Sequence, residues 1–80
     1  MAALAERGLT QVLCEGGPHL FGALTAADAV DEICLTVTPL VAGPGAGRII
    51  AGAPLTDPRR LVLAHLLEED GNLLHRYARP

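Results

Sequence analysis

The clearest hydrophobic pattern in the chain is an alternation that begins after Asp31-Glu32. Ile33, Leu35 and Val37 are separated from one another by cysteine and threonine. A period of two is typical of a β-strand with one buried face. Pro39 cannot donate to a β-ladder, so the strand is expected to end there or to lie at an edge.

Two apolar segments near the end of the chain predict a β-hairpin. Residues 61–67 form the first strand of the prediction and residues 73–77 form the returning strand, with Asp70-Gly71-Asn72 as the turn between them. His65 and His75 are expected to face each other across this hairpin as a cross-strand pair.

The first third of the chain predicts two short helices and one strand. Residues 2–7 are rich in alanine, and Gly8 suits the end of a helix. Residues 9–14 are partly β-branched and predict a strand. Pro18 then suits a helix start, and apolar residues at helical spacing predict a helix over residues 19–26.

This order of elements predicts an α/β fold in one domain, residues 1–80. A strand–helix–strand unit favours a parallel pair with a right-handed crossover, while the closing hairpin is antiparallel. We therefore expect a mixed sheet of about four strands with one or two helices and a C-terminal β-hairpin. The glycine-rich residues 43–47 predict a connecting loop, because they lack the Gly-Lys-Ser/Thr ending of a phosphate loop.

Composition restricts the possible partners and the location. Half of the residues are apolar, the net charge is −3 and all basic residues are arginine, without a basic run. This argues against nucleic acid or an anionic membrane as a partner. The sequence predicts no export signal and no membrane-spanning stretch, so we expect a cytoplasmic protein with Cys14 and Cys34 as free, buried thiols. The spacing of histidine and cysteine predicts no metal site.

Glu15-Gly16-Gly17-Pro18 is the segment that most suggests a binding site. A strand that ends in two glycines and continues into a helix presents free backbone N–H groups, which attract an anion such as phosphate. An ordinary tight turn is the alternative. Glu15 lies where open α/β sheets bind ligands. Its alternative role is to cap the helix that follows or to bind a neighbouring turn.

Two long segments resemble the reductase domain of bacterial riboflavin biosynthesis. The first is LTQVLCEGGPHLFGALTAADAVDEICLTVTPLVAGPG, with Glu-Gly-Gly-Pro, Val-Asp-Glu and a glycine-rich loop in the family's order. The second is LVLAHLLEEDGNLLHRYAR, which resembles the family's final hairpin. The resemblance implies a dihydrofolate reductase-like fold. It also implies an NADPH-dependent reduction of a phosphorylated ribosylamino pyrimidine, of the 5-amino-6-(5-phosphoribosylamino)uracil type, to its ribityl form.

The resemblance also assigns roles to the glycine turn. It implies that Gly16, Gly17, Pro18, His19 and Leu20 contact the NADPH pyrophosphate, and that Glu15 lies near the substrate. It assigns no catalytic residue and no metal ligand to this chain.

The resemblance places the chain in the C-terminal part of the family's domain, so a partial domain without its N-terminal half is expected. The isolated chain is then expected to be inactive, because hydride transfer requires nicotinamide and substrate to be held together. Alternatives are a non-catalytic remnant or oligomerisation module of this fold, or a paralogue that reduces another pteridine or pyrimidine. An incomplete core also predicts a homo-oligomer, most simply a two-fold dimer.

Overall fold

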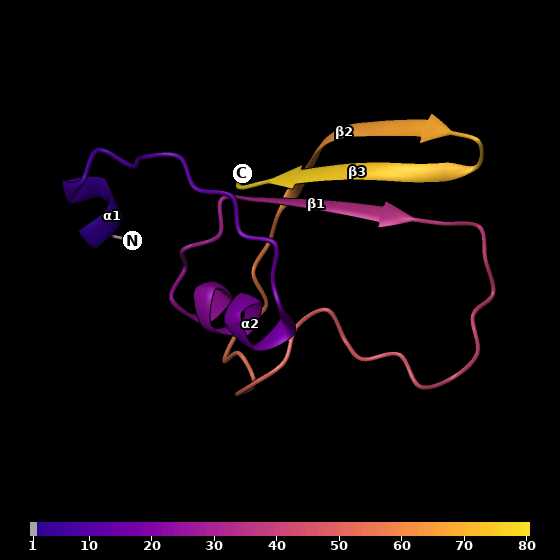
Figure 1. Ribbon diagram of the computed structural model, residues 1–80, viewed down its shortest axis with the longest axis horizontal. Coiled ribbons are helices and arrows are strands. Elements are labelled where there is room, and N and C mark those ends of the chain that lie inside the picture. The colour runs from indigo at the N-terminus through magenta and orange to yellow at the C-terminus, as the bar shows by residue number, and fades with distance from the viewer. Residues whose placement is uncertain (1) are drawn as a thin grey trace. The chain divides into compact units, whose positions relative to one another are not determined.

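The computed structural model describes residues 2–80 and divides into two compact units. The first unit comprises residues 2–29 and Arg48–Pro54, and the second comprises Val30–Gly47 and Leu55–Pro80. The elements are α1 (Ala2–Glu6), α2 (Pro18–Ala26), β1 (Glu32–Val37), β2 (Val62–Glu69) and β3 (Asn72–Ala78), shown in Figure 1. The predicted α/β class is confirmed.

Both predicted helices form in the first unit. α1 ends as expected at a left-handed glycine, Gly8, with φ of 80°. The Gly8 N–H donates to the Ala5 carbonyl at 2.9 Å, and the Leu9 N–H donates to the Leu4 carbonyl at 3.0 Å. These bonds satisfy carbonyl groups that the end of a helix leaves without partners.

The strand predicted over residues 9–14 does not form. This segment has no regular secondary structure, and Leu13 is 84% exposed. Strand propensity becomes a strand only where a neighbouring strand pairs with the backbone groups. Within residues 2–80 the sheet contains β1, β2 and β3 alone and no strand pairs with this segment, so the predicted parallel pair and its crossover were wrong.

The second unit contains one antiparallel sheet of three strands in the order β1-β3-β2. β3 is central, and β1 and β2 are the two edges, as Figure 1 shows. The sheet therefore has three strands where about four were expected, and it is not mixed. The predicted C-terminal hairpin is confirmed.

The hairpin turn contains two residues, Asp70 and Gly71, with φ of 51° and 83°. Two successive positive φ values are those of the type I′ turn that suits a tight hairpin. This turn places His65 opposite Arg76, and Leu66 opposite His75. The predicted His65–His75 pair was therefore wrong by one residue, and the two histidines lie on opposite faces of the sheet.

One face of the sheet is more apolar than the other. Ile33 and Leu35 of β1 are half-buried there, beside Tyr77 and His75 of β3. The His75 and Tyr77 rings stack with centroids 5.6 Å apart. Among the described residues no hydrophobic side chain is fully buried, and Thr25, 9% exposed, is the single buried residue. The apolar residues are thus gathered but only partly covered.

Candidate functional site

The glycine turn before α2 has the backbone form that the sequence suggested. Gly16 has φ of 109°, a value that residues with a Cβ rarely adopt, and the peptide bond between Gly16 and Gly17 is cis. Gly17 is the N-cap of α2, with φ of −88° and ψ of −157°. Pro18 then occupies the first turn of the helix, as predicted.

The start of α2 presents backbone N–H groups without a side-chain cap. The first bond of the helix runs from the Phe21 N–H to the Gly17 carbonyl at 2.9 Å. The N–H groups of His19 and Leu20 precede this bond, so they have no acceptor within the helix. No side chain caps this end, and the first turn contains no acidic residue. These N–H groups can bind an anion, and the helix dipole favours it.

The predicted site residues lie together because they are consecutive in the chain. All six, from Glu15 to Leu20, are exposed. A Cβ built on Gly16 or Gly17 meets no atom within 4 Å, so the space beside both glycines is open. Glu15 does not cap α2, because the N-cap is Gly17 and makes no side-chain cap bond. Capping is thereby removed from the roles considered for Glu15.

A contact that the sequence did not predict positions α2. The Ala51 N–H donates to the Pro18 carbonyl at 3.0 Å, which joins the chain after the glycine-rich loop to the first helical turn. A Cβ built on Gly22 would clash with the Ala51 carbonyl and lie 3.6 Å from the Ile50 side chain. A glycine inside a short helix is the only sequence signal of this close approach.

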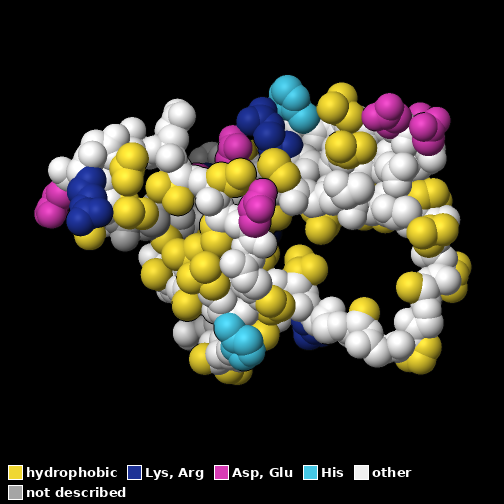
Figure 2. All heavy atoms as spheres, in the orientation of Figure 1, with side chains coloured by type: hydrophobic (Ala, Val, Ile, Leu, Met, Phe, Trp, Pro, Cys, Tyr) yellow, Lys and Arg dark blue, Asp and Glu magenta, His cyan; other side chains and the backbone are white. Residues whose placement is uncertain are grey.

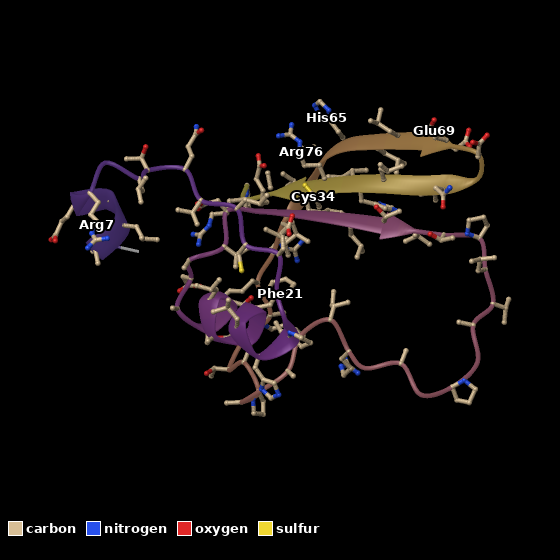
Figure 3. The ribbon with its side chains drawn as sticks, viewed as in Figure 1. Arg7, Phe21, Cys34, His65, Glu69 and Arg76 are labelled. Atoms are coloured by element: carbon tan, nitrogen blue, oxygen red, sulfur yellow. The ribbon has the colours of Figure 1, made fainter. Side chains whose placement is uncertain are left out.

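The remaining reactive side chains do not form a second site. Cys14 and Cys34 are free, as predicted, but both are exposed where buried thiols were expected, because the described residues form no closed core around them. His65 and Arg76 lie side by side on the hairpin (Figure 3). In the described part of the chain, no group of three or more histidine, cysteine or acidic side chains could hold a metal ion. None of the helices described has the length and apolar character needed to cross a membrane.

Comparison with protein families gives a match over most of the chain. Residues 1–74 match the RibD C-terminal domain. The chain belongs to this family. The match includes the whole Glu15–Leu20 segment, α2, β1, β2 and the start of β3. No curated protein matches the chain.

Membership confirms the resemblance to the riboflavin-biosynthesis reductase domain and the dihydrofolate reductase-like class of the fold. The members of this family are generally NADPH-dependent reductases. In this chain the start of α2 has exposed N–H groups without a side-chain cap.

Proposed function

We propose that the chain is part of an NADPH-dependent pyrimidine reductase of riboflavin biosynthesis. In this proposal the ribosylamino group of a phosphorylated pyrimidine is reduced to the ribityl form. Family membership supports the reaction class. The observation that carries the cofactor assignment is the uncapped start of α2 beside two unobstructed glycines.

The residues of the turn would contact different parts of the cofactor and the substrate. The N–H groups of His19 and Leu20 would donate to the cofactor pyrophosphate, and Gly16 and Gly17 would allow it to approach the backbone. Bound NADPH would supply the hydride. Glu15, exposed beside the turn, would contact the substrate and not the phosphates, since its carboxylate would repel them.

Gly17→Val is the variant that tests the cofactor site. Gly17 has an extended backbone, and a Cβ built on it meets no atom within 4 Å. The valine side chain would therefore enter the open space beside the turn that the cofactor would occupy. Losing one charge-assisted hydrogen bond costs about 1.5–3 kcal/mol, so NADPH affinity should fall at least about tenfold. Fluorescence titration with NADPH measures this, with circular dichroism to show that the variant keeps its fold.

Glu15→Ala is the matched control in the same turn. It removes a negative charge beside the proposed phosphate site, so NADPH binding should not weaken. Inorganic pyrophosphate should compete with NADPH in the wild-type chain. Equal NADPH affinity of the wild type and Gly17→Val would refute the proposed site.

We also propose that the chain forms a homo-oligomer, most simply a two-fold dimer. The supporting observation is that the described residues bury no hydrophobic side chain completely. Covering such side chains contributes about 1.5–3 kcal/mol each, and a second copy is a direct way to cover them. Sedimentation at micromolar concentration should show a dimer, and a cooperatively folded monomer at all concentrations would contradict this.

A further inference from the structure

β2 is a strongly apolar strand at the edge of the sheet, and one of its two sides has no partner strand among the described residues. Among the strands of residues 2–80 it pairs with β3 alone, and all eight of its residues are exposed. The exposed fractions of Val62, Leu63, Leu66 and Leu67 are 45%, 51%, 49% and 62%. Figure 2 shows hydrophobic side chains along the hairpin and acidic side chains at its turn. An exposed apolar edge of this kind can pair with another strand.

The two ends of β2 carry opposite charges. Arg59 and Arg60 precede the strand, and Glu68, Glu69 and Asp70 form its end and the turn. When two copies of a strand pair antiparallel about a two-fold axis, the beginning of one lies beside the end of the other. The basic end of each β2 then lies beside the acidic end of the second, which makes the edge complementary to itself.

The backbone register of the hairpin selects one such alignment. Glu69 and Asn72 flank the two-residue turn and form its closing hydrogen-bonded pair. From there along β2, residues that hydrogen-bond to β3 alternate with residues whose N–H and C=O groups point to the open edge. Counting from the turn, Glu68 and Leu66 point outward. The irregularity between Leu63 and His65 inserts one residue, so beyond it Leu63 points outward. Leu61 immediately precedes β2, and an extension of the strand by one residue would turn it outward as well.

A two-fold axis between Ala64 and His65 satisfies this pattern. It places Leu63 opposite Leu66 of the second copy, and Leu61 opposite its Glu68, so that outward groups meet outward groups. Leu63 and Leu66 share a face of the sheet, because their partners on β3 are Tyr77 and His75. The same axis places Val62 opposite Leu67 and Arg60 opposite Glu69 on the other face. Apolar pairs therefore form on both faces, and ion pairs form at both ends.

We propose that two copies of the chain pair antiparallel through the open edges of β2, which joins their sheets into one of six strands. The inference rests on the dimer proposed above and names its surface. The irregularity in β2 has a positive role here. The extra residue between Leu63 and His65 disfavours other registers of the β2–β2 pair. In the proposed register it brings the outward-pointing N–H and C=O groups of the two strands opposite one another.

Charge exchange at Arg60 and Glu69 tests the alignment. Arg60→Glu or Glu69→Arg alone turns both terminal ion pairs into like-charge pairs, so the dimer dissociation constant should rise roughly tenfold or more. The double variant Arg60→Glu/Glu69→Arg restores attraction and should restore affinity. An equal mixture of the two single variants should also dimerise, because every facing pair is then attractive. Sedimentation at low salt measures all four cases.

Glu6→Arg is the matched control, because it makes the same charge change at an exposed position outside β2 and should leave the dissociation constant unchanged. Three results would overturn the inference. A wild-type chain that is always monomeric contradicts both the dimer and its interface. A dimer insensitive to both single variants leaves the dimer standing and excludes the β2 edge. Weakening without recovery in the mixture excludes the proposed register.

Discussion

Gly22→Ala is expected to destabilise the first unit by about 1–2 kcal/mol, although alanine is the better helix former. In an exposed helix the same change stabilises by about 1 kcal/mol, because glycine loses more backbone entropy on folding. Here the new Cβ would clash with the Ala51 carbonyl, a backbone group that cannot rotate away. Overpacking of this kind costs about 1–3 kcal/mol, which outweighs the gain in propensity.

The exchange rate of the Ala51 amide is the direct measurement, since this N–H donates to the Pro18 carbonyl at 3.0 Å. Loss of about 1.4 kcal/mol corresponds to tenfold faster exchange. Gly43→Ala is the control, because no atom lies within 4 Å of its Cβ and its φ is not left-handed. Unchanged or slower exchange of Ala51 in Gly22→Ala would show that the close approach does not hold α2.

Gly71→Ala is expected to destabilise the hairpin by about 2 kcal/mol, for two separable reasons. Gly71 has φ of 83°, where a residue with a Cβ pays about 1–2 kcal/mol. A Cβ at this position would also lie 3.2 Å from Cγ of the Pro39 ring. Because β3 is the central strand, loss of the turn weakens the pairing of β3 with β2 and then with β1. Denaturant unfolding and amide exchange of β3 measure the effect.

Pro39→Ala separates the two causes. If the proline ring contributes, the double variant Gly71→Ala/Pro39→Ala should lose less stability than the sum of the single changes. Gly71→Asn should be milder than Gly71→Ala, because asparagine tolerates the left-handed region better. A Gly71→Ala hairpin as stable as the wild type would show that the type I′ turn does not determine the register.

The position of α2 links the stability predictions to the proposed function. In the proposed site the N–H groups of His19 and Leu20 would bind phosphate only with the first turn of α2 formed, and the Ala51 N–H bonds to that turn through the Pro18 carbonyl. Gly22→Ala should therefore also weaken NADPH binding, whereas Gly71→Ala acts on the other unit. Comparing the two variants distinguishes a local effect on the site from a general loss of stability.

The sequence by itself determined the local elements, because their signals act over a few residues. Gly8 ends α1, Pro18 begins α2, and Asp70-Gly71 turns the hairpin. The alternation from Ile33 to Val37 predicted β1 to within one residue of its observed bounds. The glycine turn and its six candidate residues could also be found, since they are consecutive and need no tertiary structure to lie together.

Only the tertiary structure decided which strands pair and in what register. Residues 9–14 have strand propensity but pair with no strand among the described residues, whereas β1 pairs with β3 across a separation of some forty residues. The two-residue turn at Asp70-Gly71 sets a register in which His65 lies opposite Arg76 and not opposite His75. The contact of Gly22 with Ala51 likewise joins distant segments. Pairing, register and close approach depend on residues far apart in the chain, so no local pattern could specify them.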